Sequence, residues 1–81
     1  MSKYGDSVVV IIDASDLKCP EPLMLLRKSI RELGLGESVG MHSTDLGTAR
    51  DIPMYCQHMG HILVESNTDS SPHYFVVKRG S

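Results

Sequence analysis

Cys19 is the residue of this chain whose surroundings best suit covalent chemistry. It lies in the run Leu17-Lys18-Cys19-Pro20-Glu21-Pro22, between an apolar, strand-like segment and an amphipathic helical pattern. A thiol at a helix N-terminus meets the positive end of the helix dipole and free backbone N–H groups, and both favour the thiolate. Because the thiolate is the nucleophilic form of cysteine, the motif indicates sulfur chemistry at Cys19.

The neighbours of Cys19 modify this expectation. Lys18 adds a positive charge that favours the thiolate, whereas Glu21 opposes it. Pro20 and Pro22 suit the first turn of a helix, where backbone N–H groups have no intrahelical partner. They make the corner rigid but remove two N–H donors near the sulfur. A loop-to-helix corner faces solvent, so we expect Cys19 to be an exposed, reactive thiol rather than a small core residue.

Cys56 has a different setting, among Ile52, Tyr55 and Met59 in a second helical pattern. That setting is typical of a thiol in the core. The alternative is a resolving partner for Cys19 in a dithiol redox pair, which requires Cα atoms within about 7 Å of each other. Cys56 with His58 and His61 matches no standard zinc spacing, so we expect no metal site, and no cofactor is indicated.

A nucleophilic hydrolase would need a base beside the thiol. The four histidines are scattered along the chain and none is singled out by its spacing from Cys19: His42, His58, His61 and His73. Sulfur exchange by a preformed thiolate needs no such base.

Composition restricts the class of protein. With 81 residues, 41% of them hydrophobic, the chain is expected to form one small domain over residues 1–81. It has no long apolar stretch, and Met1–Asp6 is polar without a signal region, so we expect a cytoplasmic protein without a membrane span. Two cysteines 37 positions apart do not suggest a disulfide framework. The net charge of −2 argues against direct binding of nucleic acid.

The hydrophobic pattern predicts six elements. A β-branched strand over 8–12 is followed by a helix from Pro20 that ends before Gly34 and Gly36. A weaker strand over 37–43 is interrupted by Gly40. A short second helix follows, with Asp51 as N-cap, Pro53 in the first turn and Gly60 as its end. Strands over 62–65 and 73–78, joined by a polar turn over 67–72, complete the order β-α-β-α-β-β. This order fits an α/β fold with a four-stranded mixed sheet and both helices on one face.

Lysines and arginines form a basic edge along the predicted first helix, namely Lys18, Arg27, Lys28 and Arg31, and Arg50 in the second helical region is a further candidate for docking. Such an edge is either a solvated face or a docking surface for an acidic partner.

Two segments of the chain carry a family resemblance. The pattern Asp13-Ala14-x-x-Leu17-x-Cys19-Pro20-Glu21-Pro22-Leu23, followed by Arg50-Asp51-Ile52-Pro53-x-Tyr55-Cys56, resembles the TusA (SirA-like) family of small sulfur carriers. The resemblance implies a two-layer α/β sandwich in which Cys19 accepts sulfane sulfur as a persulfide from a cysteine desulfurase. Cys19 would then pass this sulfur to a downstream relay protein, in the pathway that makes 2-thiouridine at tRNA wobble positions.

Asp16 departs from the family pattern, in which a glycine usually precedes Leu17. If this position needs a positive φ, aspartate tolerates it better than most residues, and its carboxylate would raise the pKa of the Cys19 thiol. Two other functions stay open. One is a non-catalytic regulatory or RNA-binding module that uses the basic edge, although aromatic residues are only 5% of the chain. The other is the Cys19/Cys56 dithiol redox protein.

Overall fold

Regular elements follow one another in the predicted order β-α-β-α-β-β. The computed structural model describes residues 8–69 and 71–81. The polar segment 1–6 and Ser70 of the predicted turn lie outside the described residues. The elements are β1 (Val8–Ala14), α1 (Glu21–Glu32), β2 (Ser38–Ser43), α2 (Leu46–Met59), β3 (Ile62–Asn67) and β4 (His73–Lys78). Neither described helix is long and apolar enough to cross a membrane.

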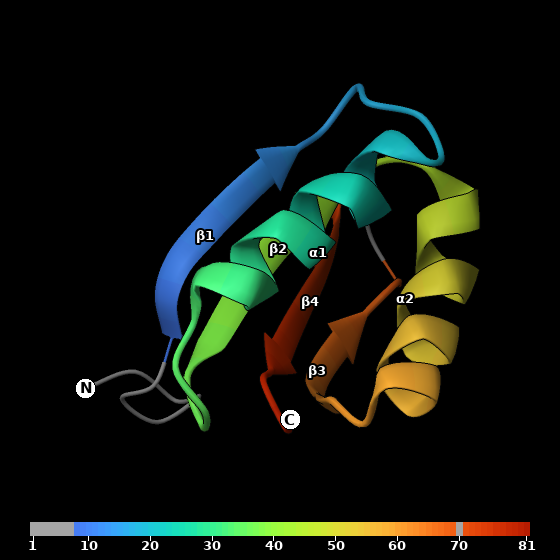
Figure 1. Ribbon diagram of the computed structural model, residues 1–81. Helices are drawn as coiled ribbons and strands as arrows, with labels where there is room; N and C mark the ends of the chain where they lie inside the picture. Colours follow the sequence, from blue (N-terminus) through green and yellow to red (C-terminus); the bar gives the residue numbers. More distant parts are fainter. Residues whose placement is uncertain (1–7, 70) are drawn as a thin grey trace.

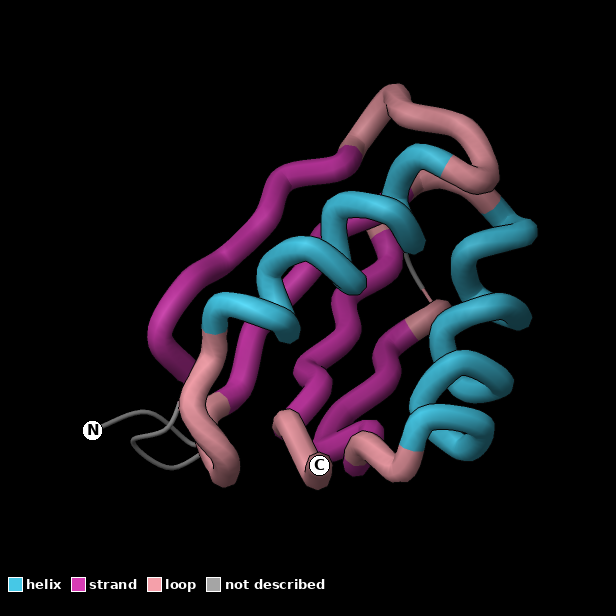
Figure 2. Tube along the Cα trace, in the orientation of Figure 1, coloured by secondary structure: helices cyan, strands magenta, loops and turns pink. Residues whose placement is uncertain are grey.

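The sheet is mixed, and its strand order is β1-β2-β4-β3. β1 and β2 are parallel, whereas β4 is antiparallel to both of its neighbours. Figures 1 and 2 show both helices on the same face of the sheet, which confirms the predicted two-layer arrangement. Because β1 and β2 are parallel, the loops that leave their carboxyl ends lie at the same edge of the sheet. These loops lead into α1 and α2.

The core lies between the helices and the sheet. Leu26 and Ile30 of α1 are four residues apart and buried, as are Ile52 and Cys56 of α2, so each helix turns one apolar stripe toward the strands. The strands contribute alternate residues to the same core: Val39, Met41, Phe75 and Val77. Each fully buried large apolar side chain stabilises the fold by about 1.5–3 kcal/mol. This burial fixes the position of both helices on the sheet.

The predicted start of the second helix is wrong. α2 begins at Leu46, and its N-cap is Asp45, whose carboxylate accepts a hydrogen bond of 3.1 Å from the Thr48 N–H. Asp51 and Pro53 therefore lie inside the helix. An internal proline removes one i→i−4 hydrogen bond, here to the Ala49 carbonyl. The buried stripe of α2 offsets this loss. Gly60, with φ of 77°, ends the helix as predicted.

The predicted interruption at Gly40 is also wrong, because β2 runs through it with regular pairing to both neighbours. Glycine is needed here for space rather than for conformational freedom. A Cβ at position 40 would lie 2.6 Å from the hydroxyl oxygen of Tyr74 on the adjacent strand. Tyr74 therefore packs directly over the backbone of β2.

The loop from β1 to Cys19 begins with a tight turn. The N–H of Leu17 donates to the carbonyl of Ala14 at 3.2 Å. Asp16, the third residue of this turn, has φ of 71°, which is the pattern of a type II turn. The N–H of Asp16 also donates to Thr44 Oγ1 at 3.0 Å, which joins this loop to the loop after β2. A positive φ at the position of the family glycine is thus confirmed.

We predict opposite effects of two substitutions at Asp16. Asp16→Val should lower the free energy of unfolding by about 1–2 kcal/mol, because a β-branched residue is strained at positive φ. Asp16→Gly should leave that free energy unchanged or raise it. Urea denaturation followed by circular dichroism measures both. Equal stability of the valine and glycine variants would contradict the assigned turn.

Candidate functional site

Cys19 is exposed at the corner where the N-terminal ends of the two helices meet. Pro20 is the N-cap of α1, so Cys19 lies one residue outside that helix. The first turn of α2 lies on its other side. A Cβ built at Gly47 would be 3.5 Å from the Cβ of Cys19 and 2.9 Å from Asp45 Oδ2. Glycine at position 47 therefore allows the cysteine loop and the capping carboxylate to approach the same turn of α2.

The Cys19 thiol has a carboxylate partner. Its Sγ–H donates a hydrogen bond to Asp51 Oδ2, with the two heavy atoms 3.1 Å apart. The residues are 32 positions apart in the sequence, and Asp51 is brought to the thiol by α2, on whose N-terminal half it lies. The side chain of Asp51 is half-buried, which limits the water that can screen its charge.

This geometry raises the pKa of the Cys19 thiol rather than lowering it. The largest cause is the hydrogen bond to Asp51, followed by partial desolvation and by the negative charges of Asp51 and Asp45. Arg50 acts in the opposite direction and lowers the pKa. The prediction of a thiol whose pKa is depressed by the helix dipole is therefore wrong. At rest the sulfur is a protonated, hydrogen-bonded thiol.

The residues next to Cys19 in the predicted motif differ in their exposure to solvent. Pro22 is buried in the first turn of α1, while Glu21 is exposed at the start of that helix. Lys18 is exposed and lines a pocket of about 260 Å³ together with Asp16, Leu17, Thr44 and Asp45. The expected effects of Lys18, Glu21 and Asp16 on the thiol are not borne out, because none of these side chains is among the groups that shift the pKa of Cys19. The charges that act on the sulfur come from α2 and its cap.

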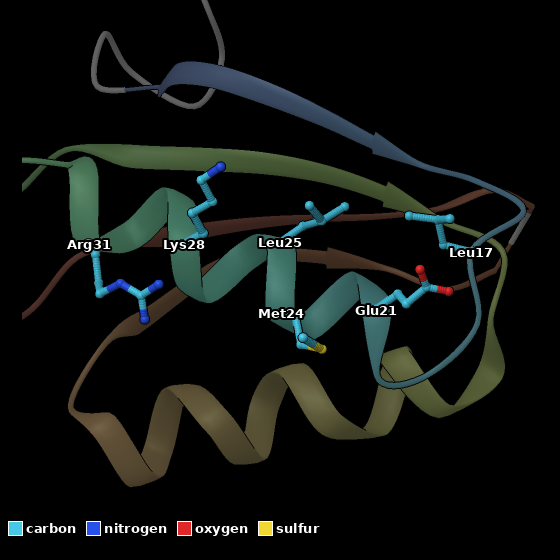
Figure 3. Close-up of a pocket in the computed structure, with 6 residues that line it drawn as sticks. All are labelled: Leu17, Glu21, Met24, Leu25, Lys28 and Arg31. Carbon is cyan, nitrogen blue, oxygen red and sulfur yellow. The ribbon is translucent and has the colours of Figure 1, made fainter.

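A larger pocket lies along α1 and begins beside the cysteine loop. Its volume is about 390 Å³, and it is lined by Leu17, Glu21, Met24, Leu25, Lys28 and Arg31 (Figure 3). We call this the α1 pocket. Met24 is 59% exposed, so the floor of the pocket presents apolar surface to solvent. Arg27 lies on the same helix and shares a neighbouring hollow with Met24 and Arg31. Arg50 is exposed on α2, away from this basic edge but beside Cys19.

Cys56 faces the core. It is 3% exposed, and burial raises its pKa to about 11, so it remains a protonated thiol at neutral pH. Both cysteines are free. A buried thiol of high pKa is a poor nucleophile and a poor resolving partner, which disfavours the dithiol redox alternative.

The histidines do not assemble around the thiol. The hydrogen bond of Cys19 goes to Asp51, whereas the buried Nδ1 of His73 has no hydrogen-bond partner among the described residues. Over residues 8–69 and 71–81, no group of three His, Cys, Asp or Glu side chains is arranged to hold a metal ion.

Sequence reasoning missed Asp51 and Asp45 as members of the site. One local signal was available for Asp45: Thr48, Ile52 and Cys56 recur at four-residue intervals, and they form the buried face of α2. With a helix that reaches back to Thr48, Asp45 is the natural N-cap. No local signal pairs Asp51 with Cys19, since that contact depends on the packing of two helices.

We predict that Asp51→Asn lowers the pKa of the Cys19 thiol, because it removes the nearest negative charge but keeps a side chain of the same shape. The rate of alkylation by iodoacetamide, measured against pH, reports the thiolate fraction. Cys56 is silent in this assay because it is buried. Asp69→Asn, which makes the same charge change in the β3–β4 turn, is the control. A pKa that stays the same or rises in Asp51→Asn would refute the assigned contact.

Comparison with known proteins agrees with this architecture. The family model described as "Sulfurtransferase TusA" matches residues 10–79. The crystal structure of a SirA-like protein from Desulfitobacterium hafniense superposes with a TM-score of 0.78 at 21% sequence identity. That match covers 90% of this chain and 100% of the other, and it shows a shared fold. The family match extends over nearly all of the described residues and includes Cys19 and Asp51, and on this ground the chain belongs to the TusA family.

Proposed function

We propose that this protein is a sulfur carrier in which Cys19 holds sulfane sulfur as a persulfide. The observation that carries the proposal is an exposed thiol at the meeting point of two helices, with a carboxylate as its hydrogen-bond partner, in a chain of the TusA family. Membership of this family implies partners in a sulfur relay. A carrier needs an accessible sulfur and a scaffold that presents it, and the domain provides both.

The chemistry consists of two exchanges at sulfur. In the first, the exposed Cys19 thiol loses its proton to water, and the thiolate attacks the outer sulfur of a donor cysteine persulfide. A new S–S bond forms at Cys19, the donor S–S bond breaks, and the donor leaves as a thiolate. In the second, an acceptor thiolate attacks the outer sulfur of the Cys19 persulfide, and Cys19 is released as a thiol. Sulfane sulfur moves without net oxidation or reduction, so no cofactor is needed.

The donor that we propose is a cysteine desulfurase, and the acceptor is a downstream relay protein in the 2-thiolation of tRNA wobble uridine. This assignment follows the family, and we place the protein in the cytoplasm, where thiols stay reduced. A net charge of −2 suits a protein that passes sulfur to another protein rather than to RNA directly.

The α1 pocket is the proposed docking surface for these partners. It starts at Leu17 and Glu21, on either side of Cys19 in the sequence, and ends at Arg31. Its apolar floor and basic rim fit a partner that presents an apolar side chain surrounded by acidic residues. A partner seated there would place its own sulfur near the helix corner. Arg27 extends the positive charge along α1, and Arg50 adds a separate positive charge beside Cys19.

We predict that wild-type protein gains one sulfur atom when it is incubated with a cysteine desulfurase and cysteine. Cys19→Ser should gain none, because the nucleophile is absent, and Cys56→Ser should gain as much as the wild type. Intact mass spectrometry measures the gain, and peptide mapping locates it. Persulfide found only at Cys56 would overturn the proposed function.

We predict that Arg27→Glu slows association with the desulfurase about tenfold at low salt and weakens the salt dependence of the rate. Stopped-flow or surface-binding kinetics over a salt series measure both. Lys78→Glu makes the same charge change on the opposite face of the sheet and should leave the rate unchanged. If both variants slow association equally, the effect comes from the net charge of the protein, and the proposal that the α1 pocket is the docking surface is wrong.

A further inference from the structure

The contact between Cys19 and Asp51 has opposite effects on the empty and the loaded state of a sulfur carrier. In the empty state the sulfur is a thiol, and Asp51 Oδ2 accepts its hydrogen bond at 3.1 Å. In the loaded state the group is a persulfide, which is more acidic than a thiol because the second sulfur carries the charge. An anionic persulfide has no proton to donate, so the carboxylate that stabilised the thiol now repels the sulfur.

We propose that Asp51 sets how weakly Cys19 holds its sulfur: its carboxylate favours the empty thiol over the loaded persulfide and so directs sulfur onward to the acceptor. This inference rests on the proposed carrier function and concerns the equilibrium of the transfer rather than the identity of the partners. Near neutral pH the reaction is Cys19–SH + R–SS⁻ ⇌ Cys19–SS⁻ + R–SH, in which one S–S bond forms, one breaks and the negative charge moves with the sulfane sulfur to Cys19. Asp51 shifts this equilibrium to the left.

The other charges near the sulfur are consistent with this role. Asp45, the N-cap of α2, raises the pKa of Cys19 as Asp51 does, and Arg50 lowers it. Lys18 and Glu21 lie near Cys19 in the sequence, but neither is among the groups that shift its pKa. Two half-buried carboxylates thus face the sulfur against one exposed guanidinium. The charges around the helix corner therefore disfavour a negative charge on the sulfur of Cys19.

The test is an equilibrium of sulfane sulfur between the protein and glutathione. Wild-type and variant proteins are incubated with glutathione persulfide and excess glutathione near neutral pH, and the loaded fraction of Cys19 is measured by intact mass. Asp51→Asn should raise the equilibrium constant for loading about fivefold, the effect of removing one unit charge about 4 Å away in an aqueous setting. The increase should diminish at acidic pH, where the persulfide is protonated and carries no charge to repel.

Asp16→Asn is the matched control. It removes a carboxylate three residues before Cys19, keeps a side chain that tolerates positive φ, and should leave the loaded fraction unchanged. An equal or lower loaded fraction in Asp51→Asn, or the same increase in Asp16→Asn, would overturn the proposal. A small persulfide reaches any exposed thiol, so the result does not depend on a desulfurase. Failure of loading by the desulfurase would reject the carrier function while leaving this equilibrium measurable.

Discussion

The parallel pairing of β1 with β2 is the constraint on which the site depends. Parallel strands send their following loops to the same edge of the sheet, and here those loops carry Cys19 and Asp45. Because α1 and α2 both bury an apolar stripe on the same face, their first turns start side by side at that edge (Figure 1). The bond between the Asp16 N–H and Thr44 Oγ1 joins the two loops directly. The thiol and its carboxylate therefore meet because of topology, although 32 positions separate them.

Much of the fold follows from local patterns in the sequence. The β-branched run that begins at Val8 and the alternation around Phe75 identify strands, since their side chains suit a sheet with one buried face. The order of the elements then leaves few topologies. The predicted start of α2 is wrong because proline is commonest in the first turn of a helix, whereas Pro53 lies inside α2. Tertiary packing overrides the preference of proline here. Gly40 was read as a break because its real reason, the hydroxyl of Tyr74, lies on another strand.

The site was predictable only in part. The position of Cys19 at an exposed corner follows from the pattern around it, and the positive φ of Asp16 follows from the family glycine. The ionisation of the thiol does not follow, because a helix dipole near two prolines is a weaker influence than a carboxylate at 3.1 Å. Long-range contacts between side chains decide electrostatics, and a linear pattern does not specify them.

The strand order has a consequence for the synthesis of the protein. β4 follows the other three strands in the sequence but lies between β2 and β3 in the sheet. Until residues 73–78 have been made, β2 lacks its antiparallel neighbour, β3 pairs with nothing, and the helices have only part of their floor. Contacts that span such long stretches of chain form late in folding. A chain that contains Cys19 and Asp51 but not yet β4 therefore lacks the complete sheet against which both helices pack.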